Sequence, residues 1–152
     1  MMNKNHQPRF AYIAPTYSQA KKIAWDYLKF YTKNLPSTKY NETELRADFF
    51  NGSRIQLLSS ENPDSIRGIY LDGAVIDEAS QVSRELVDEV IRPALSDRKG
   101  WLSLCSTPKG MNNIFYDMYL KAQSDDGWFL YTAKASETGL VDDDELKAAL
   151  SV

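Results

Sequence analysis

Short apolar runs with strand character alternate with segments of helical periodicity along this chain, and this alternation limits the fold most strongly. The strand-like runs are "RFAYIAP" (9–15), "GAVI" (73–76) and "WLSLCS" (101–106). Apolar residues at helical spacing follow the first two runs, over 20–31 and 86–94. Such alternation implies crossover connections and parallel strands. We predict an α/β fold with a mostly parallel sheet and flanking helices.

Three further elements complete the expected fold. The segments "ELRADFF" (44–50) and "SRIQLLS" (53–59) flank Asn51-Gly52, a dipeptide typical of a tight hairpin turn. We expect this antiparallel hairpin as an insertion or at an edge of the sheet. Pro93 should disturb the second helix. After a helix over 114–122, "GWFLYTAKA" (127–135) predicts a late strand, and a further helix is expected from about Asp142.

Composition narrows the class of protein. The 152 residues suit one domain with a proper core. A formal net charge of -3 argues against a nucleic-acid binder held by bulk positive charge, although a local basic face stays open. Cys105 and His6 are the single residues of their types, which excludes a disulfide framework and a Cys/His zinc site. No run is long and apolar enough for a membrane span, so we expect a soluble protein of the cytoplasm.

Two adjacent carboxylates, Asp77 and Glu78, follow the apolar run 73–76 directly. Ligands of parallel sheets bind at the carboxyl ends of strands. Adjacent strand residues point to opposite faces, so both carboxylates serve one site only if the chain turns just after Asp77. Nucleoside triphosphate hydrolysis uses such a pair: Asp77 would hold Mg²⁺ through water, and Glu78 would accept a proton from the attacking water. Alternatively, Asp77, Glu78 or Ser80 caps the following helix.

A second polar loop follows the next strand along the chain. In "STPKG", Ser106, Thr107 and Gly110 come directly after the run 101–105. Hydroxyl groups there would sense the γ-phosphate and pass the signal to the following helix. The alternative is a Ser/Thr-Pro turn with a glycine exit.

Four motifs together resemble the ATPase domain of the large terminase subunit of tailed bacteriophages: "YIAPTYSQAKKIAW", "SIRG", "GAVIDEAS" as the Walker B element with its catalytic glutamate, and "STPKG" as the coupling motif. The resemblance implies a RecA-like, P-loop NTPase-type fold that uses ATP and Mg²⁺. It implies a motor, in the full-length protein of a phage or prophage, that couples ATP hydrolysis to translocation of double-stranded DNA. The implied partners are double-stranded DNA, other copies of the chain in a ring, a small terminase subunit and the portal protein, with no membrane.

Arg67 of "SIRG" lies eleven positions before Glu78. The resemblance implies that this arginine reaches the ATP of a neighbouring subunit and stabilises charge during phosphoryl transfer. The alternative is an arginine that bonds loop carbonyls or pairs with Asp64 or Asp72.

The chain departs from the family pattern at two places. The phosphate-binding pattern G-x-x-x-x-G-K-[ST] does not occur; Gly68 and Gly73 have the glycine spacing, but Ala74 and Val75 stand where Lys and Ser/Thr are required. We expect residues 1–136 to form a partial ATPase domain, and 137–152 to lead towards a missing C-terminal nuclease domain. By itself this fragment should hydrolyse ATP negligibly.

Two other interpretations stay open. A superfamily 2 helicase fragment also has a strand ending in Asp-Glu, although "DEAS" and "STPKG" point away from it. A non-catalytic α/β interaction module would use the same carboxylates as caps and would need no phosphate loop.

Overall fold

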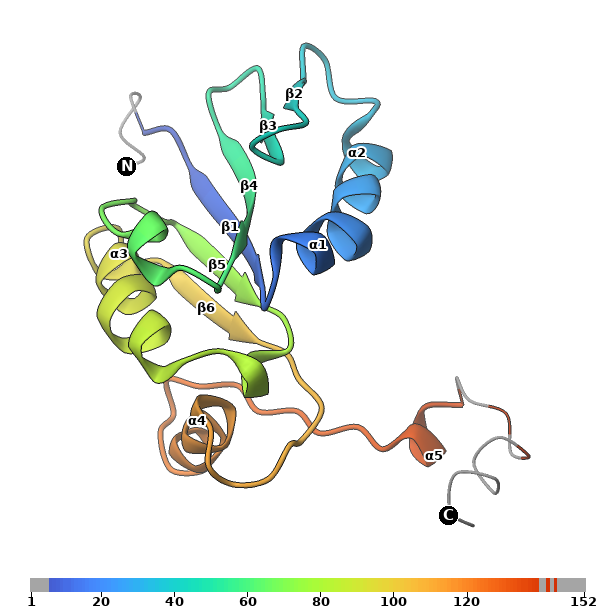
Figure 1. Ribbon diagram of the computed structural model, residues 1–152, viewed down its shortest axis with the longest axis vertical. Coiled ribbons are helices and arrows are strands. Elements are labelled where there is room, and N and C mark those ends of the chain that lie inside the picture. Colours follow the sequence, from blue (N-terminus) through green and yellow to red (C-terminus); the bar gives the residue numbers. More distant parts are fainter. Residues whose placement is uncertain (1–5, 140–141, 143, 145–152) are drawn as a thin grey trace. The chain divides into compact units, whose positions relative to one another are not determined.

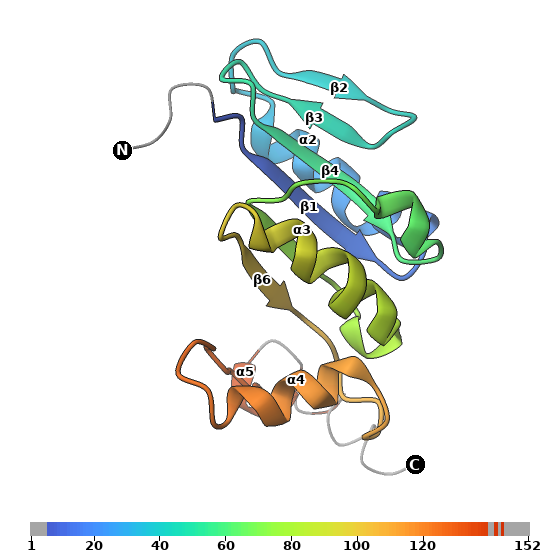
Figure 2. The same cartoon turned by 90° about the vertical axis from the view of Figure 1, so that its left-hand side faces the viewer.

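A computed structural model describes residues 6–139, 142 and 144. Six strands form one sheet in the order β2-β3-β4-β1-β5-β6 (Figures 1 and 2). The strands are β1 (Arg9–Ala14), β2 (Lys39–Asn41), β3 (Arg46–Asp48), β4 (Arg54–Ser59), β5 (Gly73–Ile76) and β6 (Trp101–Leu104).

Four neighbouring strands of the sheet run parallel, as predicted. β1 pairs in parallel with both β4 and β5, and β5 pairs in parallel with β6. β3 is antiparallel to β4, and β2 is antiparallel to β3. The expected hairpin is therefore confirmed, and its second arm is an inner strand while its first arm lies towards the edge. The short edge strand β2 was not predicted, because it has no apolar pattern.

The hairpin turn is longer than the two-residue turn that Asn51-Gly52 suggests. The Phe49 amide donates to the Ser53 carbonyl, and the Gly52 amide donates to the Phe49 carbonyl, each at 2.9 Å. Only Gly52 takes a positive φ, of 80°, while the Asn51 side chain accepts the Ser53 amide at 3.0 Å. This is a three-residue loop that ends in a left-handed glycine, the next commonest hairpin type.

Helices cover both faces of the sheet. The helix that follows β1 lies on one face, and the helix that precedes β6 lies on the other (Figures 1 and 2). The helical segments are α1 (Tyr17–Ala20), η1 (Lys21–Trp25), α2 (Asp26–Thr32), η2 (Pro63–Ile66), η3 (Ala79–Gln81), η4 (Leu86–Ile91), α3 (Arg92–Ser96), α4 (Ile114–Ala122) and α5 (Ala135–Thr138).

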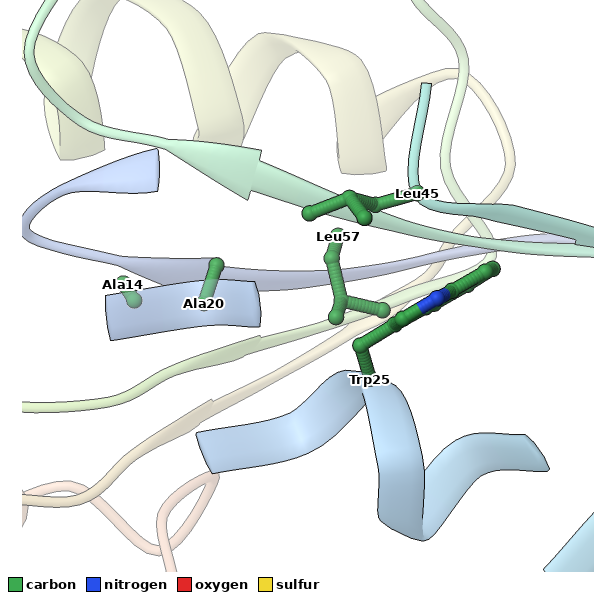
Figure 3. Close-up of a cluster of buried hydrophobic side chains, with 5 residues drawn as sticks. All are labelled: Ala14, Ala20, Trp25, Leu45 and Leu57. Carbon is green, nitrogen blue, oxygen red and sulfur yellow. The ribbon is translucent and has the colours of Figure 1, made fainter. Parts of the chain in front are cut away.

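Trp25 is the centre of the core beneath the first helix. Its side chain is 1% exposed and packs with Ala14, Ala20, Leu45 and Leu57 (Figure 3). The indole N–H donates to Glu42 Oε2 at 2.6 Å, so the one polar atom of the ring is satisfied. This cluster ties the helix to β1 and β4, and so fixes where β1 ends.

The second helix is disturbed at Pro93, as predicted. Proline has no amide hydrogen and cannot bond the carbonyl one turn earlier. The helix widens to π-type geometry over η4, where the Arg92 amide bonds the Val87 carbonyl. The apolar face is buried as expected.

The chain divides into two compact units, Met1–Met118 and Tyr119–Val152. The prediction of a strand over 127–135 is wrong: the segment forms no strand, and Phe129 is 89% exposed. A strand needs a ladder partner, and no described strand pairs with this segment. The helix expected from about Asp142 lies outside the described residues, apart from Asp142 and Asp144. The domain boundary at residue 136 stays a prediction.

None of the helices in the described part of the chain is sufficiently long and apolar to cross a membrane.

Candidate active site

The candidate site lies at the carboxyl ends of the parallel strands. The register places Ile13 of β1 beside Ile76 of β5, and Ile76 beside Leu104 of β6. The residues that follow β5 and β6 therefore leave the sheet at the same edge. The structure thus brings the acidic pair and the Ser106 loop together.

Asp77 is the first residue after β5 and is held from three sides. Its amide donates to the Ile13 carbonyl at 2.8 Å. Its Oδ1 accepts the Glu78 amide at 2.9 Å, and its Oδ2 accepts the hydroxyl of Tyr12. Each carboxylate oxygen keeps lone-pair capacity for one more donor, such as a water molecule. The half-buried carboxylate is therefore oriented but still able to bind a ligand.

Sequence reasoning missed Tyr12. Burial raises the pKa of its phenol, and the hydrogen bond to Asp77 raises the pKa further. The phenol thus stays neutral and keeps donating at ordinary pH. The usable signal was the strand pairing, because Tyr12 lies opposite Val75 and so shares a face with Asp77, two residues later.

Glu78 makes the turn that a joint site requires. Its backbone is left-handed, with φ 48° and ψ 43°, and η3 follows directly. A left-handed conformation costs a non-glycine residue about 1–2 kcal/mol. The expected turn after Asp77 is confirmed. A second missed contact holds the Glu78 side chain, whose Oε2 accepts Gln81 Nε2 at 3.2 Å.

The capping alternative for the acidic pair is not supported. Glu78 precedes η3 without a capping hydrogen bond from its side chain. The longer helix that contains η4 is capped instead by Ser83, whose Oγ accepts the Leu86 amide at 3.2 Å. The two carboxylates are thus free of the structural task that would explain them without chemistry.

Ser106 connects the two loops. Its Oγ lies 2.8 Å from Ser80 Oγ and accepts the Ser80 amide at 3.2 Å. The Ala79 amide donates to the Cys105 carbonyl at 3.0 Å. The turn after β5 is therefore bonded directly to the loop after β6.

Thr107 and Gly110 belong to the same loop but contact the pair only indirectly. The Thr107 carbonyl lies 3.0 Å from Ser106 Oγ, and Gly110 takes a φ of 68°. Asn113, which the sequence did not single out, binds the carbonyls of Lys109 and Gly110 through Nδ2 and accepts the Tyr116 amide through Oδ1. Its buried amide thus fixes the loop to the start of α4.

Arg67 is not joined to the acidic pair by any contact among the described residues. Its guanidinium bonds Asp64 at 2.6 Å, Glu85 at 3.1 Å and Glu89 at 3.4 Å. The hydrogen bond to Asp64 contributes most to raising the pKa of Arg67. The pairing with Asp64 considered from the sequence is present, whereas Asp72 pairs with Arg98 instead.

The donor set at Asp77 fits a hydrated magnesium ion. Within residues 6–139, together with Asp142 and Asp144, no three His, Cys, Asp or Glu side chains are grouped closely enough to hold a metal ion. Mg²⁺ usually keeps several waters and takes one or two carboxylates together with substrate phosphates. A single oriented carboxylate matches that mode and does not match a site built from protein ligands alone.

The glycine spacing of Gly68 and Gly73 does not form a phosphate loop. Gly73 lies inside β5, where a Cβ atom would come within 2.3 Å of the Trp101 ring. Its role is close packing, so rejecting this motif from the sequence was correct.

Sheet order, parallel register and helices on both faces define a RecA-like α/β fold of the nucleotide-hydrolase type. A family model described as "Terminase large subunit, T4likevirus-type, N-terminal" matches residues 3–149, and the chain belongs to this family. The large terminase subunits of Thermus phage G20c and Thermus virus P23-45 are each 44% identical to it over 62 residues. These matches cover 41% of this chain and 13% of each relative.

Solved structures agree with this assignment. The large terminase ATPase domain of Thermus phage P74-26 has a TM-score of 0.65 and 27% identity, over 89% of this chain and 59% of that one. The large terminase of another thermophilic bacteriophage, in complex with ADP, has a TM-score of 0.72 over 98% of this chain and 38% of that one. At 18% identity, the second likeness concerns the fold alone.

Proposed function

We propose that this chain supplies the metal-binding carboxylate and the general base for ATP hydrolysis in a DNA-packaging motor of a phage or prophage. The observation that carries the proposal is the position of Asp77 and Glu78 at the carboxyl end of β5, joined by a left-handed turn. Membership of the large terminase family supports it, as does the ADP bound to the second of the two structural relatives.

Asp77 would bind Mg²⁺ through water. The Tyr12 hydroxyl and the Glu78 amide hold its two oxygens, so little reorientation is needed on binding. When bound, Mg²⁺ neutralises charge on the β- and γ-phosphate oxygens during transfer. Tyr12 is then a positioning residue, since it acts through Asp77.

Glu78 would accept the proton of the attacking water. The turn directs its carboxylate away from the continuation of the strand, and Gln81 Nε2 fixes one carboxylate oxygen at 3.2 Å. A general base positioned in this way contributes about 10²–10⁴-fold to a rate.

Ser106, Thr107 and Gly110 would couple the nucleotide state to movement. The contact of Ser80 with Ser106 joins the acidic turn to this loop, and Asn113 joins the loop to α4. A change at the γ-phosphate would thus reach α4 through hydrogen bonds.

Arg67 would act on the ATP of a neighbouring copy. Its three acidic partners are all exposed residues of the same chain. Exposed ion pairs stabilise a protein by only about 0–1 kcal/mol each, so releasing the guanidinium costs little. The motor would work as a ring of copies in the host cytoplasm, with a small terminase subunit, the portal protein and double-stranded DNA.

The experiment is ATP turnover with Mg²⁺ by the 152-residue chain alone and joined to an upstream segment with a phosphate-binding loop. The chain lacks the lysine and hydroxyl of that loop, so we expect negligible turnover alone and clear turnover in the joined form. Glu78→Gln should abolish the restored activity. A joined form that folds, binds ATP and stays inactive would leave the chain an interaction module.

A further inference from the structure

A hollow at the opposite edge of the sheet carries three arginines. Arg9 and Arg54 are the first residues of β1 and β4 and lie side by side in the register. Together with Arg98 they line a hollow of about 220 Å³. It lies at the amino ends of the strands, whereas Asp77 and Glu78 lie at their carboxyl ends.

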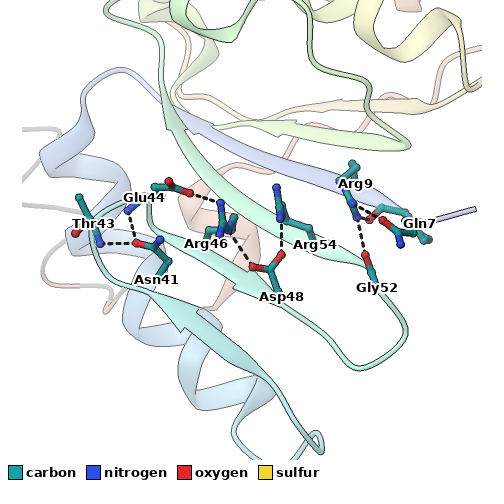
Figure 4. A network of polar contacts seen from close by, with 10 residues as sticks. Gln7, Arg9, Asn41, Thr43, Glu44, Arg46, Asp48, Gly52 and Arg54 are labelled. Carbon is teal, nitrogen blue, oxygen red and sulfur yellow. Dashed lines mark hydrogen bonds and ion pairs between the residues drawn. The ribbon is translucent and has the colours of Figure 1, made fainter.

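The charge of Arg9 is not neutralised within the described residues. Its guanidinium donates to the Pro8 carbonyl at 3.1 Å, the Gly52 carbonyl at 2.6 Å and Gln7 Oε1 at 2.8 Å (Figure 4). All three acceptors are uncharged. Burial lowers the pKa of Arg9, and the charges of Arg54 and Arg98 lower the pKa further. An anion in the hollow would relieve this repulsion.

The other two arginines have donors to spare. A guanidinium has five N–H donors. Arg54 bonds Asp48 through Nε at 2.6 Å, and Arg98 bonds Asp72 and the Gln7 carbonyl through Nη1. Within the described residues, their remaining N–H groups have no protein acceptor. The hollow therefore offers unused donors that can bind an oxyanion in bidentate fashion.

The rest of the lining is apolar. Ala11 and Leu58 form part of the floor, and Ile69 and Leu71 come from the loop before β5. Tyr70 of this loop is 55% exposed, with the Arg98 guanidinium 5.8 Å from its ring centre. Tyrosine and arginine are the residues that most often dominate protein interfaces. The hollow is smaller than typical small-molecule pockets of about 300–1,000 Å³, so it suits one or two side chains.

Neighbouring carboxylates argue against a nucleic-acid backbone as the occupant. Asp48 and Asp72 already bond two of the arginines, and a second hollow across Tyr70 is lined by Glu89 and Asp97. A phosphate backbone carries a charge at every nucleotide and would meet these carboxylates. A single carboxylate would meet only the arginines.

We propose that this hollow is a docking site for a partner protein that presents one acidic side chain flanked by apolar residues. The carboxylate would lie between Arg9, Arg54 and Arg98, and an apolar neighbour would pack on Tyr70 and Leu58. This site is independent of ATP hydrolysis, so its test does not depend on the nucleotide.

The test is fluorescence anisotropy of a labelled peptide that has one aspartate between two leucines, added to the 152-residue chain. The same peptide with asparagine is the ligand control. Arg54→Gln removes a donor from the hollow, and Tyr70→Ala removes its aromatic wall. Arg46→Gln is the matched protein control, because Arg46 lies on the same face, pairs with Asp48 and does not line the hollow.

We expect the aspartate peptide to bind and the asparagine peptide to bind at least about tenfold more weakly, the loss expected for a charged hydrogen bond. Arg54→Gln should weaken binding of the aspartate peptide by a similar factor, and Arg46→Gln should leave it unchanged. Equal binding of both peptides, or equal loss in both arginine variants, overturns the proposal. A short DNA duplex that binds more tightly, with the same dependence on Arg54, would identify a nucleic-acid site and also overturn it.

Discussion

The side-chain oxygens of Ser80 and Ser106 lie 2.8 Å apart and join the loops that follow two neighbouring strands. One loop carries the acidic pair, and the other leads to α4. The contact gives "STPKG" a structural reason to follow "DEAS" by one strand: each loop satisfies polar groups of the other.

Ser106→Ala should loosen this junction. The variant loses the acceptor of the Ser80 amide and the hydroxyl contact, at a cost of about 1 kcal/mol in free energy of unfolding. Amide hydrogen exchange should show faster exchange at Ser80. Thr107→Val is the control, since only the backbone carbonyl of Thr107 contacts Ser106. Unchanged Ser80 exchange in Ser106→Ala would contradict the contact.

Tyr12 should ionise late in an alkaline titration. Burial and Asp77 raise its pKa above the ordinary value of 10.0, so the folded state keeps the proton after the unfolded chain has lost it. The stability from this group is therefore complete below pH about 10 and is lost as pH rises further. Absorbance of tyrosinate should lose its latest step in Tyr12→Phe. In Tyr131→Phe, which removes an exposed ring, that step should remain.

Glu78→Gly should stabilise the fold while removing the proposed base. Release of the left-handed strain gains about 1–2 kcal/mol, and the greater freedom of glycine in the unfolded chain costs about 0.5–1 kcal/mol. A small net gain should appear in urea unfolding. Glu78→Gln keeps the strain and should match the parent chain. A clear loss of stability in Glu78→Gly would indicate that the side chain stabilises the turn.

Gly73→Ala should destabilise β5 just before the acidic pair. The new methyl group would come within 2.3 Å of the Trp101 ring, and overpacking of this kind costs about 1–3 kcal/mol. Urea unfolding measures the loss. In a Trp101→Leu background the same substitution should cost much less, because the ring is gone. Equal costs in both backgrounds would rule out the clash.

Much of the fold followed from local patterns. β1, β5 and β6 are short apolar runs, and their order with the intervening helices was sufficient to predict a parallel sheet. The helix over Leu86–Ser96 buries the expected residues, because its period survives the widening before Pro93. The turn at Glu78 was predicted from the need to place two adjacent carboxylates in one site.

The misses have long-range causes. The segment 127–135 has the composition of a strand, but composition does not supply a ladder partner. The contacts of Tyr12 with Asp77 and of Asn113 with the Gly110 loop depend on strand register and loop path, which no short motif reports. The arginine hollow likewise joins residues far apart in sequence, from β1, β4 and the segment before β6.

The most direct test of the central claim separates nucleotide binding from turnover in the chain joined to a phosphate-loop segment. Glu78→Gln should lower kcat by about 10²–10⁴-fold and leave the Kd for ATP-γ-S unchanged, because the proposed base acts in the chemical step. Asp77→Asn should weaken binding in the presence of Mg²⁺. Turnover by Glu78→Gln at the rate of the parent chain would contradict the assignment of Glu78 as the base.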